Sequence, residues 1–175
     1  VDVLTGTNAA TAILTAVMHA ARTGTGQHID MSLFDVSVAS LANQALNYMV
    51  SGTAPGRLGN AHPNIVPYQA FATADGYIIL AVGNDSQFRK FCDIAALDGF
   101  ADDPDYATNK ARVTNRTALL PHVETAMASH TTGWWLDQLA DAGVPAGPIN
   151  NINLVLAEPQ AVHRGLPASI PDDLN

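Results

Sequence analysis

Two aspartates stand where helices are expected to begin, and a carboxylate in that position can do chemistry. Asp2 precedes apolar residues at helical spacing in VDVLTGTNAATAIL, and Asp35 opens DVSVASLANQALNYMV. The positive end of a helix dipole keeps a carboxylate ionised, so it can act as a nucleophile or cap the first turn. From these residues alone a helix cap is the favoured interpretation of Asp2, and spacing does not choose between the two acids as a reactive group.

A third candidate is the segment GNAHPN, residues 59–64, within TAPGRLGNAHPNIVP. The segment is dense in glycine, proline and asparagine and has no hydrophobic periodicity, which is typical of an ordered functional loop or a linker. The patterns of predicted structure differ on its two sides. We therefore expect it to join two structural units.

Other apparent motifs have simpler explanations. Gly24 and Gly26 in TGTGQ close a helix and precede a predicted strand, whereas a phosphate-binding glycine loop follows a strand and opens a helix. Cys92 shares a predicted helical face with Phe88 and Phe91, so buried packing is favoured over nucleophilic chemistry. We expect no metal site, because metal-ligand spacing is missing from the six histidines, which are His19, His28, His62, His122, His130 and His163.

Composition narrows the classes of protein. The chain has 175 residues, 47% of them hydrophobic and 14% charged, which suits one or two globular domains with a real core. Its net charge of −8 argues against nucleic acid or an anionic membrane as a partner. A single cysteine excludes an intrachain disulfide and fits a reducing compartment, and no segment has the pattern of a signal peptide or a membrane span. We expect a cytoplasmic protein.

The hydrophobic pattern predicts an α/β piece followed by a smaller α+β unit. The first part should contain a helix over 3–22, a strand over 27–34 and a helix over 35–50. The second should contain a β-hairpin of 68–73 and 77–82, a turn-rich return in GVPAGPIN and one short helix in INLVLAEPQAVHRG. Longer helices are expected over 85–97, 115–129 and 131–142, the last two capped by Asn115 and Thr131.

Several blocks in order resemble the class III CoA-transferase family of the CaiB/BaiF type. These are DVLTG, TGTGQHIDMSLFD, LGNAHPNIVPYQAFATADGYIILAVGNDSQF, NRTALL, WLDQLADAGVPAGPINNI and EPQAVHRG, and they extend to about Leu166. The resemblance implies that Asp2 is the catalytic nucleophile, which overturns its interpretation as a cap. It also implies that a mobile loop containing Gly59, Asn60, Ala61 and His62 covers the CoA thioester, while it assigns no role to Asp35.

The same resemblance implies a domain plan. Residues 1–58 would be part of a Rossmann-like large domain whose upstream half is missing, 59–66 the active-site loop and linker, 67–160 a small α+β domain, and 161–175 the start of the return to the large domain. Complete members form interlocked homodimers, bind no permanent cofactor and use a CoA thioester as substrate. We therefore expect this chain alone to be an inactive fragment.

The implied reaction moves CoA from an acyl-CoA to a carboxylic acid through an aspartyl anhydride and an aspartyl-CoA thioester. The segment IVPYQAFATADGYIILAVGND most resembles the dicarboxylate branch, so succinate or glutarate is an expected acceptor. One alternative is a 2-methylacyl-CoA racemase, a relative that places a glutamate at or next to the position of Asp85. Another is an inactive fragment that only folds or binds a partner.

Overall fold

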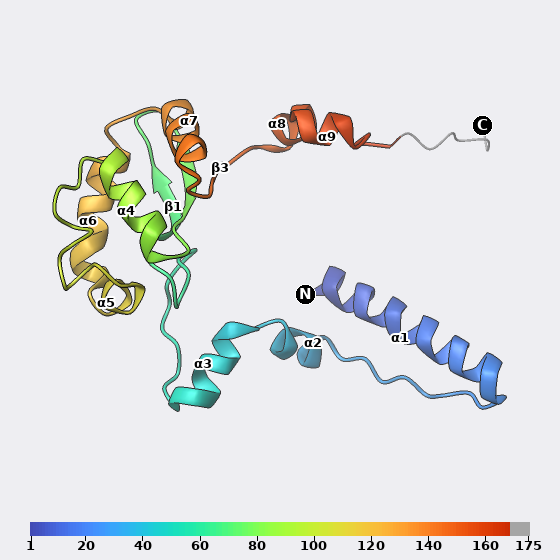
Figure 1. The fold of residues 1–175 in the computed structure, drawn as a ribbon. Helices are drawn as coiled ribbons and strands as arrows, with labels where there is room; N and C mark the ends of the chain where they lie inside the picture. Colours follow the sequence, from blue (N-terminus) through green and yellow to red (C-terminus); the bar gives the residue numbers. More distant parts are fainter. Residues whose placement is uncertain (169–175) are drawn as a thin grey trace. The chain divides into compact units, whose positions relative to one another are not determined.

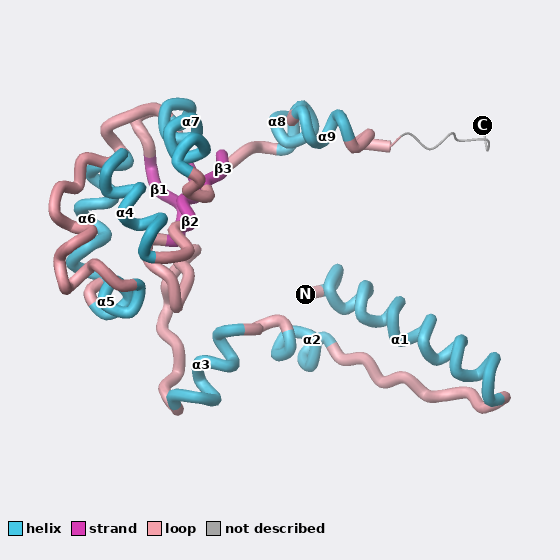
Figure 2. Tube along the Cα trace, in the orientation of Figure 1, coloured by secondary structure: helices cyan, strands magenta, loops and turns pink. Residues whose placement is uncertain are grey.

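The computed structural model describes residues 1–168 and divides the chain into two compact units, Val1–Arg57 and Leu58–Asn175. Residues 169–175 lie outside the described residues, and they are the second part of the segment 161–175 that was expected to return to a large domain. Helices occur in both units, whereas all the strands of the described residues belong to the second (Figure 2).

The first unit contains three helices, α1 (Asp2–Thr23), α2 (Leu33–Ala39) and α3 (Asn43–Ser51). Helix α1 ends at Gly24, whose left-handed backbone (φ 73°) lets its N–H donate to the carbonyl of Ala20. The predicted helix stop is therefore confirmed, because glycine takes this conformation without a steric penalty.

Two predictions for the first unit are wrong. The expected strand over 27–34 is not formed: residues 25–32 have no regular structure, and α2 begins directly afterwards with the hydroxyl of Ser32 accepting the N–H of Asp35. The expected helix over 35–50 is divided into α2 and α3, since Ala42 has a positive φ of 47° that interrupts the helical backbone.

Packing in the first unit is sparse. Val36 is its one buried hydrophobic residue, at 8% exposure, and α2 packs there against α1. Most of the remaining large apolar side chains are exposed, including Leu14, Val17 and Met49, while Ile29 and Met31 are half-buried. Within residues 1–57, all of which the structure describes, the apolar surface is therefore much larger than the core.

The second unit is built on a small antiparallel sheet of β1 (Tyr68–Ala72), β2 (Tyr77–Ala81) and β3 (Ala146–Pro148), in the order β1-β2-β3. The predicted hairpin is confirmed, with Ala70 opposite Ile79. The turn-rich return also supplies an edge strand, in which Gly147 lies opposite Ile79 on the other side of β2.

Four helices accompany the sheet, namely α4 (Asp85–Ile94), α5 (Asn109–Thr114), α6 (Arg116–Met127) and α7 (Thr132–Ala142) (Figure 1). Helix α5 was not predicted. The Thr131 cap is confirmed, because its hydroxyl accepts the N–H of Trp134. The Asn115 cap is wrong, since its side chain donates instead to the carbonyl of Asp105. The one short helix expected near the end is two, α8 (Ile152–Ala157) and α9 (Pro159–His163).

The core of the second unit lies between the sheet and these helices. Its buried members include Ile78, Phe88, Trp135 and Leu139. The indole N–H of Trp135 donates to the Met127 carbonyl at 2.8 Å, so the ring is buried without an unpaired donor. In the part of the chain that the structure describes, no helix combines the length and apolar character needed to cross a membrane.

Candidate active site

Asp2 is the first residue of α1, after Val1 as the N-cap, and it is exposed. The N-cap residue, Val1, makes no side-chain capping hydrogen bond. Asp2 therefore lies in the first turn of the 22-residue helix α1, one residue after the N-cap position.

Asp35 lies in a different environment at the first turn of α2. Its backbone N–H donates to the Ser32 hydroxyl at 2.9 Å, and its side chain is exposed. Helix α2 has seven residues, about a third of the length of α1. The Ser32 cap satisfies the Asp35 N–H, one of the donors in the first turn of α2.

The loop residues 59–62 form a tight turn and contact strand β1. Gly59 has φ 60°, a backbone conformation that suits glycine, and the Ala61 N–H donates to the carbonyl of Leu58. The Asn60 carboxamide oxygen accepts the N–H of Ala70 in β1 at 2.8 Å. The loop is thus tied to the edge strand through an asparagine side chain.

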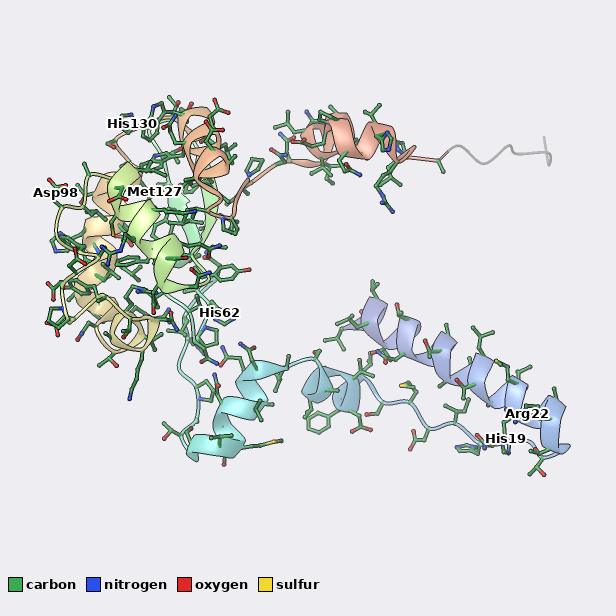
Figure 3. The ribbon with its side chains drawn as sticks, in the orientation of Figure 1. His19, Arg22, His62, Asp98, Met127 and His130 are labelled. Atoms are coloured by element: carbon green, nitrogen blue, oxygen red, sulfur yellow. The ribbon has the colours of Figure 1, made fainter. Side chains whose placement is uncertain are left out.

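His62, labelled in Figure 3, is half-buried. Its backbone N–H donates to the Tyr68 carbonyl at 2.9 Å, and its ring stacks on the Tyr68 ring at 5.2 Å between centroids. Its Nδ1 accepts the N–H of Asn64 at 3.1 Å. A neutral imidazole that accepts at Nδ1 carries its proton at Nε2, so His62 presents a donor in a fixed direction.

Two side chains of α5, Asn109 and Arg112, bind the backbone of residues 64–66, which follow the loop. Arg112 is completely buried; its Nε donates to the Val66 carbonyl at 2.7 Å and its guanidinium lies 4.2 Å above the Phe88 ring. The Asn109 side chain donates to the Asn64 carbonyl and accepts the Val66 N–H. Burial lowers the pKa of Arg112, while its hydrogen bond and attraction to Asp85 raise it.

Asp85 has a structural task. Its Oδ1 accepts from Arg112 Nη2 at 2.9 Å and from the Asn109 N–H at 2.8 Å. An acid that compensates a buried guanidinium is held by that pair and is poorly placed to exchange a substrate proton.

The structure brings part of the predicted site together. Gly59, Asn60, Ala61 and His62 form one connected segment of the second unit, whereas Asp2 belongs to the first unit, and each is described within its own unit. Sequence reasoning missed Asn109, Arg112 and Arg116. Arg112 lies in α5 and Arg116 begins α6, so helical spacing in the sequence gave no signal that both side chains reach residues 62–66.

The predictions for cysteine and metal sites concern other parts of the described chain. Cys92 is buried, and burial raises the pKa of its thiol to about 12, so it stays protonated and is filler, as the sequence predicted. Within residues 1–168, no three histidine, cysteine or acidic side chains gather as a metal-binding group.

Comparison with known proteins identifies the family. The model of CoA-transferase family III matches residues 1–174. This chain belongs to CoA-transferase family III. Among its curated relatives, a succinate–glutarate CoA-transferase of Agrobacterium fabrum is 51% identical over 94% of the chain. A human succinyl-CoA:glutarate CoA-transferase is 42% identical, also over 94% of the chain.

Solved structures agree with this family III assignment. A CaiB/BaiF family protein of Brucella suis matches 93% of the chain with 49% identity and a TM-score of 0.73. A hypothetical protein of Mycobacterium tuberculosis matches 94% with 26% identity and a TM-score of 0.77. The chain spans about two fifths of the relatives it matches, 41% and 38% of the two transferases and 43% of each solved chain.

Proposed function

We propose that the protein containing this chain transfers CoA from an acyl-CoA to a carboxylic acid, and that Asp2 is the nucleophile. The observation that carries the proposal is the 51% identity, over 94% of the chain, to a relative named for succinate and glutarate. The position of Asp2 at the start of α1 supports it. The experiments use the product of the whole reading frame that contains this chain, hereafter the complete protein.

The proposed reaction proceeds through two carboxylate–thiolate exchanges. An Asp2 oxygen attacks the thioester carbonyl and the C–S bond breaks. The CoA thiolate departs, and Asp2 is then joined to the donor acyl group as a mixed anhydride. The thiolate then attacks the Asp2 carbonyl, which releases the donor as a carboxylate and leaves an aspartyl-CoA thioester. The acceptor carboxylate attacks that thioester, and the displaced thiolate takes the acceptor acyl group, which regenerates Asp2.

Both intermediates react with water, so the site must exclude it. The segment Gly59–Asn64 is proposed to cover the thioester. The proposal is supported by two contacts of this segment with β1. The Asn60 side chain accepts the Ala70 N–H, and the His62 N–H donates to the Tyr68 carbonyl. The N–H groups at the start of α1 are proposed to bind the oxyanion that forms at each carbonyl.

The proposed substrates are an acyl-CoA and a small dicarboxylate, of the kind named for the Agrobacterium and human relatives. The complete protein is proposed to be a homodimer containing a Rossmann-like large domain, to which residues 1–58 contribute. The exposed apolar side chains of α1 and α3 support this, because a larger assembly would cover them.

One assay separates the three alternatives. The complete protein is incubated in deuterated water with succinyl-CoA and isotope-labelled glutarate, and in parallel with a 2-methylacyl-CoA and no acceptor. The proposal predicts labelled glutaryl-CoA and no deuterium at the α-carbon. Rapid α-deuteration without an acceptor would establish the racemase instead. If neither reaction occurs, the third alternative holds, a protein that only folds or binds a partner.

A further inference from the structure

Arg116 differs from the other structurally engaged arginines of the second unit in what it binds. Its Nη2 donates to two backbone carbonyls, that of His62 at 2.7 Å and that of Pro63 at 3.0 Å. Arg112 and Arg89 each pair with an aspartate, whereas within residues 1–168 no carboxylate lies within 4 Å of the Arg116 guanidinium. Its charge is directed to the backbone of the candidate loop.

The environment of Arg116 strengthens this contact. The side chain is half-buried, and burial lowers the pKa of its guanidinium. A cation that loses part of its water needs other oxygen ligands, and the two carbonyls supply them through charge-assisted hydrogen bonds. A neutral side chain in this place could not bind them equally well.

The two carbonyls that Arg116 binds belong to His62 and Pro63, and the His62 side chain is itself held in place. The His62 backbone N–H and ring are both held by Tyr68, so fixing its carbonyl fixes the peptide plane on either side of the imidazole. The helix that carries Arg116 contacts β1, the strand to which Asn60 is tied. The loop and its anchor therefore share one rigid support.

We propose that Arg116 is a positioning residue that holds the loop 59–64 over the reacting thioester, so that CoA passes to the acceptor and not to water. The inference rests on the proposed function. Without this anchor, water would attack the aspartyl-CoA carbonyl, the C–S bond would break, and free CoA and the Asp2 carboxylate would form. Loss of Arg116 would thus divert turnover to hydrolysis.

The test compares three substitutions in the complete protein. Arg116→Gln removes the cation but keeps a polar side chain, and Arg116→Lys keeps the charge. Arg89→Gln is the matched control, because Arg89 is an exposed arginine of the same unit that pairs with Asp102. For each variant, free CoA and glutaryl-CoA formed from succinyl-CoA and glutarate are measured together by chromatography.

The ratio of hydrolysis to transfer is the decisive quantity, because it does not depend on how much enzyme is folded. We expect Arg116→Gln to raise the ratio about tenfold, equivalent to about 1.4 kcal/mol in relative barriers. Arg116→Lys should largely restore the ratio, and Arg89→Gln should leave it unchanged. An unchanged ratio in Arg116→Gln, with both rates reduced together, would overturn the proposal and leave only a role in stability.

Hydrogen exchange of residues 58–67 provides a second readout that does not require activity. Faster exchange there in Arg116→Gln, with wild-type exchange in Arg89→Gln, would support the anchoring, and unchanged exchange would overturn it. A wild-type protein that transfers no CoA would contradict the proposed function, and therefore the catalytic part of this inference, while the exchange experiment would still decide whether Arg116 positions the loop.

Discussion

The Asp85 carboxylate and the Arg112 guanidinium form a 2.9 Å ion pair in which the arginine side chain is fully buried and the aspartate side chain is 55% exposed. The same aspartate oxygen accepts the N–H of Asn109, and Arg112 continues to the carbonyl of Val66. The pair therefore connects the start of α4 and the helix α5 to the segment that precedes β1.

Replacing Asp85 should destabilise the second unit. Asp85→Asn keeps the shape and an acceptor but leaves the buried Arg112 cation without its counter-charge, so we expect the free energy of unfolding to fall by about 2–4 kcal/mol. Urea denaturation measures the change. The control, Asp102→Asn, removes the exposed pair with Arg89 and should leave the midpoint unchanged. Equal effects of the two substitutions would refute the structural role of Asp85.

Asp75 offers a test of local electrostatics. Its pKa is lowered chiefly because its Oδ1 accepts the backbone N–H of Thr132 at 2.7 Å, with the Thr132 and Thr73 side chains adding to the effect. Thr132 is the first residue of α7, where proline is tolerated. Thr132→Pro should therefore raise the Asp75 pKa toward its ordinary value while α7 persists, as followed by NMR titration of the carboxyl carbon.

A matched variant separates the backbone from the hydroxyl. Thr132→Ala keeps the N–H but loses the hydroxyl contact to Thr73, and it should raise the Asp75 pKa less than Thr132→Pro does. Because the folded pKa is depressed, the carboxylate stabilises the fold above the unfolded pKa of about 3.9, and this contribution is lost as the pH falls through the folded value. In Asp75→Asn the free energy of unfolding should therefore fall less steeply as the pH is lowered below about 4. An unaltered dependence on pH would contradict the stabilising role of the Asp75 carboxylate.

The second unit should fold by itself, because all the buried residues of its main core lie between Val66 and Val144. Residues 58–160 should unfold cooperatively in urea, as followed by the fluorescence of the buried Trp135. Leu139→Ala should cost about 2–5 kcal/mol through the cavity it leaves. Leu154→Ala, at a half-exposed position in α8, should change stability by less than about 0.5 kcal/mol. A gradual transition would refute an independent core.

Local signals predicted much of this fold. The hairpin of β1 and β2 followed from two apolar β-prone runs around Ala74, Asp75 and Gly76, and α7 followed from its Thr131 cap and its apolar spacing. The strand over 27–34 was wrong although Ile29, Met31 and Leu33 alternate, because a strand also needs a partner ladder and residues 25–32 have none in this structure.

Longer-range features could not be predicted from one sequence. The break at Ala42 has no glycine or proline to signal it, and α5 is only six residues long. The anchors of the candidate loop join residues far apart in the chain: Arg112 to Val66 and Arg116 to His62, 46 and 54 positions away. Such pairs depend on how helices meet the sheet, which hydrophobic periodicity does not specify.

The direct test of the central claim is to locate the CoA that becomes covalently attached during turnover. Cleavage after Arg22 and Arg57 separates Asp2 from Asp35. After incubation of the complete protein with succinyl-CoA, mass spectrometry should find a hydroxylamine-labile CoA adduct on the Asp2 peptide. The adduct and CoA transfer should both be lost in Asp2→Asn and retained in Asp35→Asn. An adduct on the Asp35 peptide, or transfer that persists in Asp2→Asn, would contradict the account.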